Sequence, residues 1–141
     1  MDVSKNMWAV KLPSGFRFNI PLYYATTVLY CSGGTGKSFI FNQLQELKAQ
    51  CKLKRNLLLI NELNIMDCAW ITQIKDILVI IDNYDVVREG YPEIVNILNS
   101  EKFQCLIMGR NINDLRLNRD YIFKLKTDRA KKEINAISVF E

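Results

Sequence analysis

The chain has 141 residues, of which 49% are hydrophobic and 24% are charged, and a formal net charge of +4, as in an ordinary soluble domain with one core. No apolar run approaches the ~20 residues of a membrane-spanning helix, and Met1–Trp8 lacks the segments of a signal peptide, so we expect a single cytoplasmic domain over 1–141. The absence of histidine excludes histidine-based catalytic triads and removes the usual general base near neutral pH.

Two short segments near the start of the chain, Met7–Leu12 and Phe16–Ile20, flank the turn sequence Pro13–Gly15. In the second segment apolar residues alternate with polar ones, which is the period of a β-strand with one apolar face. The pattern predicts an N-terminal β-hairpin over about 7–20, which Pro21 follows.

The middle of the chain alternates between short apolar segments and segments with helical spacing. The apolar segments, which we expect to be buried strands, are Thr26–Cys31, Leu57–Ile60, Ile77–Ile81 and Phe103–Met108. The segments expected to be helical are Lys37–Ala49, Asp67–Lys75 and the stretch from Pro92 to about Asn99. This alternation predicts an α/β core over about 22–123, in which a mostly parallel sheet has helices on both faces.

A second hairpin is predicted at the end of the chain, over about 121–140. Its strands are Tyr121–Lys126 and Ile134–Phe140, around a turn at Asp128–Lys132. It lies at the end of a basic run, because the residues from Arg110 to Lys132 include eight basic and only three acidic ones. Such a run is typical of a solvated surface, and it is also suited to contact with a triphosphate or with nucleic acid.

The loop after the first predicted core strand has the composition of a phosphate-binding loop. It matches the pattern GxxxxGK[ST] at every fixed position except the first and reads Cys31-Ser32-Gly33-Gly34-Thr35-Gly36-Lys37-Ser38. The glycines let successive backbone N–H groups turn toward phosphate oxygens, and the helix that starts near Lys37 adds its positive end. We expect Lys37 to reach the β- and γ-phosphates and the Ser38 hydroxyl to bind Mg²⁺.

A second motif, Ile77–Asp82, ends a predicted buried strand with a carboxylate. Ligands of such sheets bind at the carboxyl ends of the strands, so the loops after the four predicted core strands converge on one edge. Asp82 is therefore expected to lie beside the phosphate loop and to hold Mg²⁺, directly or through water.

From Thr26 to about Tyr121 the chain resembles the P-loop NTPases, in particular the additional-strand type that includes AAA-like and signalling ATPases. The resemblance rests on the phosphate loop and on the Walker B-like segment that ends at Asp82. It implies a three-layer core that binds ATP, or another nucleoside triphosphate, with Mg²⁺. The chain is also similar to short single-domain ATP-binding proteins of bacteria. It departs from the family at Cys31, where glycine is usual, and at Asn83, where many ATPases have a glutamate that acts as general base.

The same resemblance implies three candidates for catalysis. Glu62 follows the strand between the two motifs, at the position of the catalytic glutamate of RecA-like ATPases, and Asp85 lies three residues after Asp82. Arg110, or Asn111 beside it, follows the fourth strand, where related ATPases have a sensor of the γ-phosphate. Glu62 and Asp85 are also consistent with solvated surface carboxylates, and Arg110 with a turn residue that pairs with a nearby aspartate.

We expect an ATP-binding nucleotide switch with weak or partner-stimulated Mg²⁺-dependent ATPase activity. Minimal cores of this type often complete their site with an arginine from a second subunit or from a partner protein. Two alternatives stay open. The arginines of Arg110–Arg119 fit the lid of a small kinase that transfers the γ-phosphoryl group to a small acceptor. The basic C-terminal hairpin fits a module that binds nucleic acid or protein and uses ATP structurally.

The four cysteines form no CxxC pair, and with no histidine in the chain a zinc site is not expected. Cys31, Cys68 and Cys105 lie in or beside apolar segments, so we expect buried thiols, for which a reducing cytoplasm is the simplest setting.

Overall fold

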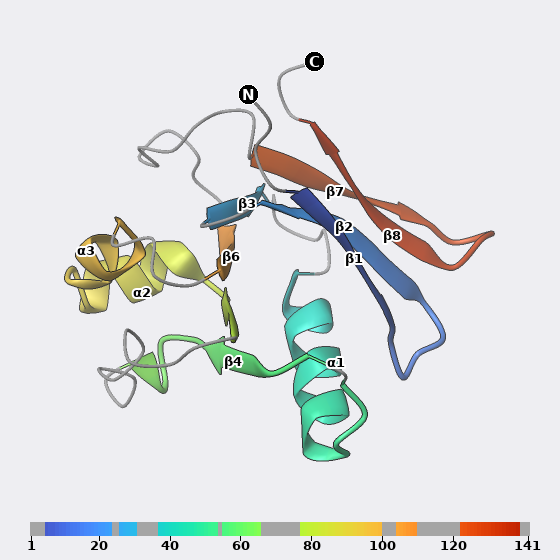
Figure 1. The fold of residues 1–141 in the computed structure, drawn as a ribbon, viewed down its shortest axis with the longest axis horizontal. Helices are drawn as coiled ribbons and strands as arrows, with labels where there is room; N and C mark the ends of the chain where they lie inside the picture. Colours follow the sequence, from blue (N-terminus) through green and yellow to red (C-terminus); the bar gives the residue numbers. More distant parts are fainter. Residues whose placement is uncertain are drawn as a thin grey trace.

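The computed structural model describes residues 5–23, 26–30, 37–53, 55–65, 77–99, 104–109 and 122–138. Within these ranges the chain forms one eight-stranded sheet and three helices (Figure 1). The strands are β1 (Lys5–Lys11), β2 (Arg17–Tyr23), β3 (Thr26–Tyr30), β4 (Leu57–Ile60), β5 (Leu78–Ile81), β6 (Gln104–Gly109), β7 (Ile122–Asp128) and β8 (Glu133–Ser138). The helices are α1 (Lys37–Ala49), α2 (Tyr84–Gly90) and α3 (Ile94–Asn99). The strand order across the sheet is β1-β2-β8-β7-β3-β6-β5-β4.

The five strands β7, β3, β6, β5 and β4 all run in the same direction and form the parallel half of the sheet. Its central strands are almost entirely apolar, because helices cover both of their faces. In β5, for example, Leu78 and Ile80 belong to the core on the side of α1, whereas Val79 and Ile81 belong to the core on the side of α2 and α3. This half confirms the predicted α/β architecture with a mostly parallel sheet.

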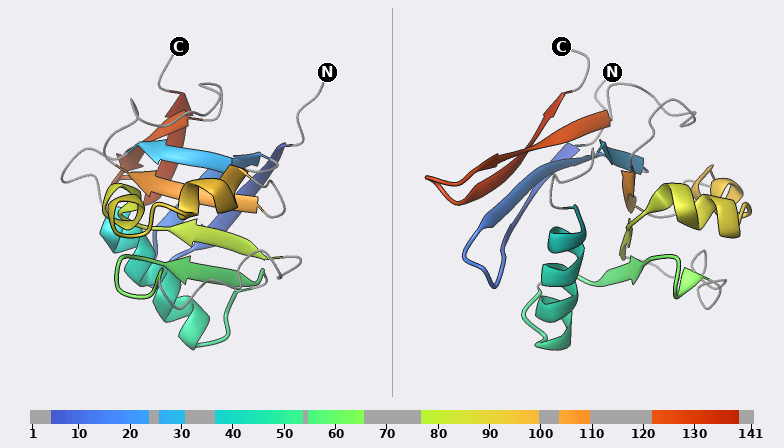
Figure 2. Two further views of the ribbon diagram at one scale, coloured as in Figure 1. Left: turned by 90° about the vertical axis from the view of Figure 1, so that its left-hand side faces the viewer. Right: turned by 180° about the vertical axis from the view of Figure 1, so that it is seen from behind.

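The sheet is strongly curled, and α1 lies on its concave side, between the parallel strands and the hairpin strands (Figures 1 and 2). The buried side chains of α1 share one core with both halves of the sheet, and they are Ile40, Phe41, Leu44 and Leu47. On the opposite face, α2 and α3 cover only the parallel half, through Tyr84, Val87, Ile94 and Leu98. The helical cover of the two faces is therefore unequal.

The two terminal hairpins form the other half of the sheet. Strands β1 and β2 pair antiparallel, as do β7 and β8, and a short parallel pairing of β2 with β8 joins the two hairpins. Phe18 of β2 is fully buried in the α1 core, and its ring meets that of Trp8 edge-on at 5.9 Å between centroids. Both predicted hairpins are confirmed.

Two details differ from the prediction, and one predicted helix is not tested. Strand β2 continues through Pro21, because its pairing with β8 ends at Asn19 and the proline lies beyond the part of β2 that is paired on both sides. Helix α2 was not predicted. The helix predicted over Asp67–Lys75 lies outside the described residues.

Two composition-based predictions are tested in part. Cys105 is a buried thiol as expected, and burial raises its pKa, whereas Cys51 is exposed and the other two cysteines lie outside the described ranges. Among the described helices, none is both long enough and apolar enough to cross a membrane.

Candidate nucleotide site

The carboxyl ends of β3, β4, β5 and β6 meet at one edge of the sheet, as the sequence predicts (Figure 2, left). Ile60, Ile81 and Ile107 lie in one row across β4, β5 and β6. Strands β3 and β6 run two residues further, to the paired residues Tyr30 and Gly109. We call this the carboxyl edge.

The phosphate-loop motif begins at the carboxyl edge. Strand β3 ends at Tyr30, just before the motif, and α1 starts at Lys37, inside it. Residues 31–36 lie outside the described ranges, and of Lys37 and Ser38 only the backbone is described. The first turn of α1 contains no acidic residue, so nothing in it offsets the positive end of the helix dipole. The strand-loop-helix context of the motif is thus present, and its phosphate contacts stay a prediction.

Asp82 is held at the carboxyl edge directly after β5. Its backbone N–H donates a hydrogen bond to the Ile60 carbonyl oxygen at 2.9 Å, which extends the pairing of β5 with β4 by one residue. Only 5% of Asp82 is exposed, which is unusual for a carboxylate. A buried oxygen ligand at a strand end beside β3 and β6 has the chemistry that Mg²⁺ prefers.

Asn83 makes the turn from β5 into α2. Its backbone is left-handed, with φ 52° and ψ 49°, and its carbonyl oxygen accepts hydrogen bonds from the N–H groups of Val86 and Val87 at 3.0 Å each. Asparagine tolerates this conformation better than most residues, and glutamate does not share that advantage. Asparagine at this position therefore has a local physical reason.

Asp85 lies in the first turn of α2, against the end of β6. A Cβ atom placed on Gly109 would lie 3.4 Å from Asp85 Oδ2 and 3.6 Å from Tyr84 Cβ, so the glycine leaves room for the carboxylate beside the strand. The Oδ1 atom is buried in both Asp82 and Asp85, and each of the two residues also interacts with other groups of the protein. The structure thus brings Asp82 and Asp85 to the same edge.

Tyr84 is a further residue of this edge, and no motif in the sequence marks it. Its side chain is buried, and the Arg88 guanidinium carbon lies 5.6 Å from the centroid of its ring. Burial raises the pKa of the Tyr84 hydroxyl, Arg88 opposes this rise, and Cys105 and Asp85 add to it. Tyr84 anchors the start of α2 in the core and so holds Asp85 beside Gly109.

Glu62 lies in an exposed turn just after β4, the outermost strand of the parallel half. Asn61 and Asn64 close this turn: the Asn61 N–H donates to Asn64 Oδ1 at 2.9 Å, and Asn64 Nδ2 donates to the Leu59 carbonyl oxygen at 2.8 Å. Glu62 is therefore at the predicted edge, with its side chain in solvent. Arg110 and Asn111 lie outside the described residues, although β6 ends immediately before them, between β3 and β5.

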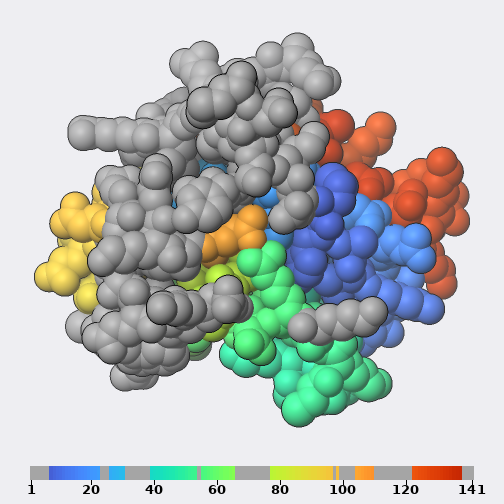
Figure 3. Space-filling model, in the orientation of Figure 1, coloured from blue at the N-terminus to red at the C-terminus, as the bar shows by residue number. Residues whose placement is uncertain are grey.

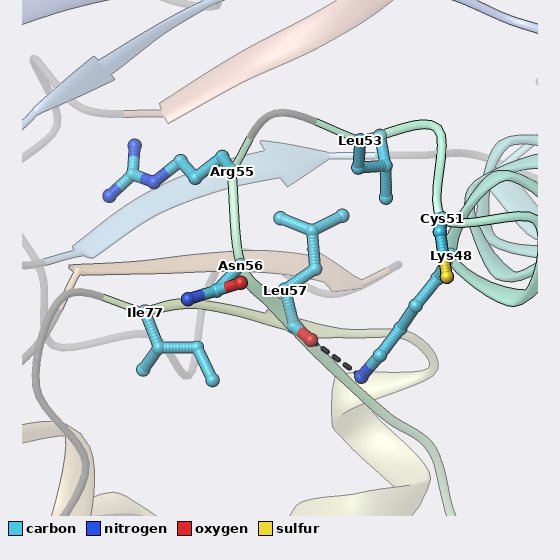
Figure 4. A pocket seen from close by; sticks show the side chains of 7 residues that line it. All are labelled: Lys48, Cys51, Leu53, Arg55, Asn56, Leu57 and Ile77. Carbon is cyan, nitrogen blue, oxygen red and sulfur yellow. Dashed lines mark hydrogen bonds between the residues drawn. The ribbon is translucent and has the colours of Figure 1, made fainter.

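A pocket of about 400 Å³ lies at the opposite, amino-terminal edge of the same strands (Figure 4). It is lined by Lys48, Cys51, Leu53, Arg55, Asn56, Leu57 and Ile77. Lys48 Nζ donates to the Leu57 carbonyl oxygen at 2.6 Å, and Arg55 donates to the side chain of Gln104. Burial lowers the pKa of Arg55. Lys48 and Arg55 thus form hydrogen bonds with the first residues of β4 and β6. The pocket that they line is separate from the carboxyl edge.

Within the described ranges, no group of three or more cysteine, aspartate or glutamate side chains is arranged to hold a metal ion by itself. A site for Mg²⁺ at Asp82 would therefore need the predicted Ser38 hydroxyl, phosphate oxygens and water as further ligands. No protein-family model matches the chain, and no curated protein matches it either.

Proposed function

We propose that this protein binds ATP with Mg²⁺ at the carboxyl edge and acts as a nucleotide switch of the P-loop class. One observation carries the proposal. The phosphate-loop motif connects β3 to α1, and the buried Asp82 ends β5 at the same edge of the sheet. A phosphate cradle and a magnesium ligand at one edge of a parallel sheet are the two parts that nucleoside triphosphate binding requires.

The strand order supports the additional-strand type and its three-layer core. Strand β6 lies between β3, which leads into the phosphate loop, and β5, which leads to Asp82. Helix α1 lies on one face of these strands, and α2 and α3 lie on the other. This arrangement agrees with a P-loop core that has one strand between its two Walker strands.

Each residue of the site has a defined task in binding. The backbone N–H groups of Ser32–Gly36 would surround the phosphates, and Lys37 would neutralise the β- and γ-phosphates. Ser38 and Asp82 would hold Mg²⁺, which, when bound, screens the negative charge of the triphosphate. The hydrogen bond from the Asp82 N–H to the Ile60 carbonyl oxygen holds the Asp82 backbone beside the end of β4.

The same geometry favours binding over rapid hydrolysis. Asn83 cannot accept a proton as a general base, and its left-handed backbone serves the turn into α2. Glu62 is exposed at the outermost strand, and Asp85 lies against Gly109. Either carboxylate needs a further group to orient the attacking water. A second subunit, a partner or Arg110 would supply that group. We therefore expect slow turnover that rises when the site is completed.

Two measurements test this function. The first is calorimetric titration with ATP in the presence and absence of Mg²⁺. Saturable binding that Mg²⁺ strengthens is expected, and a protein that binds no nucleotide would refute the proposal. The second is ATP turnover as a function of protein concentration. A rise in specific activity would show a shared site, and ADP release that depends on an added acceptor would favour the kinase alternative, whose lid residues 110–119 lie outside the described ranges.

A further inference from the structure

The positive charge of the chain is concentrated in the two hairpins. Residues 5–23 and 122–138 together contain eight lysines and arginines and two acidic residues, so they carry +6, while all other residues together carry −2. The hairpins lie next to each other in the fold and occupy one side of the molecule (Figure 3). The charge of the chain is thus asymmetric between the two halves of the sheet.

Within the hairpins, the register of the strands separates apolar from basic residues. The inner face carries Trp8, Val10, Phe18, Ile20, Phe123, Leu125, Ile134 and Ala136, which pack in or against the α1 core. The outer face, which we call the hairpin face, carries Met7, Ala9, Lys11, Arg17, Asn19, Pro21, Lys124, Lys126, Asp128, Glu133, Asn135 and Ile137. All four basic residues of the hairpin face are exposed.

The hairpin face continues the sheet face that α2 and α3 cover in the parallel half. In β7, Ile122 is buried in the α2–α3 core, whereas Lys124 and Lys126, which point to the same side, are exposed. None of the described helices covers the hairpin face (Figures 1 and 2). In an α/β protein, helices normally cover both faces of the parallel sheet. Where residues on one side of a strand change from apolar to basic, that part of the face is suited to solvent or to a charged partner.

The two hairpins present this surface as one unit. Lys11 pairs with Arg17 across β1 and β2, and the side chains of Asn19 and Asn135 are hydrogen bonded at 3.2 Å between β2 and β8. The two acidic residues, Asp128 and Glu133, are paired with each other at the turn end of the face, where Asp128 Oδ1 accepts a hydrogen bond from the Lys131 N–H. Glu133 also lies beside Arg17 in the pairing of β2 with β8, so the two carboxylates offset part of the positive charge at the turn end. Lys124 and Lys126, by contrast, lie opposite Ile137 and Asn135 and have no carboxylate as a direct partner across β7 and β8.

We propose that the hairpin face binds the phosphate backbone of a nucleic acid. Lys124 and Lys126 are two residues apart on one strand, roughly 7 Å along it, so they can contact successive charges of a linear polyanion. Exposed Arg129, Lys131 and Lys132 extend the basic surface at the turn. Contacts of this kind are made to charge and not to base edges, so binding is expected to tolerate any sequence.

A nucleic acid fits this face better than an anionic membrane does. Membrane-surface binding relies on a continuous apolar patch that enters the lipid, in addition to basic charge. The large exposed apolar side chains of the hairpin face are only Met7 on β1 and Ile137 on β8 among the described residues, with β2 between them. The neighbouring row of the face contains the polar Asn19–Asn135 pair. The charge pattern therefore matches surface contact with phosphates and does not match insertion.

The test compares charge-neutralised variants of the full chain. Labelled oligothymidine and a labelled mixed-sequence duplex are titrated by fluorescence anisotropy at salt concentrations between about 50 and 200 mM. The wild-type protein is expected to bind at low salt, with an affinity that falls steeply as salt rises. For each lysine removed, the double variant Lys11→Gln/Lys126→Gln should bind nucleic acid about tenfold more weakly at the lowest salt concentration. The plot of log affinity against log salt concentration should also become less steep, by about two units of slope.

The matched control is Lys48→Gln/Lys52→Gln, which removes the same charge from two exposed residues outside the hairpins. It should bind nucleic acid nearly as the wild type does, and circular dichroism of both double variants verifies folding. Equal losses of nucleic-acid affinity in the two double variants would overturn the proposal. It would also be overturned if the wild-type protein bound only phosphatidylserine vesicles, or bound neither nucleic-acid probe. The outcome is independent of the nucleotide site, because a Lys37→Ala variant should keep its affinity for nucleic acid.

Discussion

The carboxyl edge and the hairpin face use charged residues in opposite ways. At the carboxyl edge, Asp82 is almost fully buried directly after the pairing of β5 with β4, and Asp85 lies beside Gly109. On the hairpin face four exposed lysine and arginine side chains outnumber two half-buried carboxylates, Asp128 and Glu133. A fixed carboxylate suits one small ligand with defined geometry, whereas mobile lysines suit an extended ligand that is held by its charge.

The two regions also share a core, so we expect them to unfold as one unit. Helix α1 packs against Phe18 and Ile134 of the hairpins and against Leu78 and Leu106 of the parallel half. A change in the hairpin core should therefore be felt at the nucleotide site through α1, whose first turn lies in the phosphate-loop motif. Substitution of a buried hairpin residue tests whether the two halves of the sheet depend on the same core.

The largest expected effect is that of Phe18→Ala. Phe18 is fully buried, and its removal leaves a cavity between β2 and α1, so we expect a loss of about 3–5 kcal/mol in the free energy of unfolding. Urea unfolding followed by tryptophan fluorescence and by circular dichroism should give a single transition in both proteins. Two separate transitions, or a loss below about 1 kcal/mol, would show that the hairpins do not share a core with the parallel half.

A smaller effect is expected when the glutamate that many P-loop ATPases have after the Walker B aspartate is placed at position 83. Asn83→Glu puts a residue without the tolerance of asparagine into a left-handed backbone, which costs about 1–2 kcal/mol of stability, measured by urea unfolding. Asn83→Gly is the control and should change stability little, because glycine adopts this conformation freely. If Asn83→Glu keeps full stability and speeds ATP turnover, the backbone explanation of this departure is wrong.

The smallest effect concerns the turn of the basic C-terminal hairpin. Lys132 also has a left-handed backbone, with φ 52°, and a lysine has no side-chain group that favours it. Lys132→Gly should therefore stabilise the domain by up to about 1 kcal/mol in urea unfolding. Lys131→Gly removes the same charge at a neighbouring position without positive φ and should destabilise or change nothing. Equal stabilisation by both variants would assign the effect to charge repulsion and not to the backbone.

Sequence patterns predicted the parallel half well, because its signals are local. The bounds of α1 and β4 agree with the prediction at both ends, and β5 agrees within one residue, since each segment is a continuous run with one period. The placement of Asp82 at the carboxyl edge followed from the rule that parallel strands end together. The mostly parallel α/β sheet and the edge at which its parallel strands end were therefore predictable.

Features that depend on contacts distant in sequence were not predictable in this way. Helix α2 has only seven residues, with two adjacent valines and a tyrosine of weak helix propensity, and it is stabilised by burial of Tyr84 and Val87 on the sheet. The parallel pairing of β2 with β8 joins the two ends of the chain, and it decides which lysines share the hairpin face. No local pattern encodes that pairing.

The claim that ATP binds through the phosphate loop is tested most directly by calorimetry on two lysine variants. Lys37→Ala removes the side chain expected to reach the β- and γ-phosphates and should abolish measurable ATP binding in the presence of Mg²⁺. Lys52→Ala removes an exposed lysine just beyond the other end of α1 and should bind ATP as the wild type does. Both variants should unfold at the same urea concentration as the wild type. Unchanged ATP affinity in a folded Lys37→Ala protein would contradict the proposed nucleotide site.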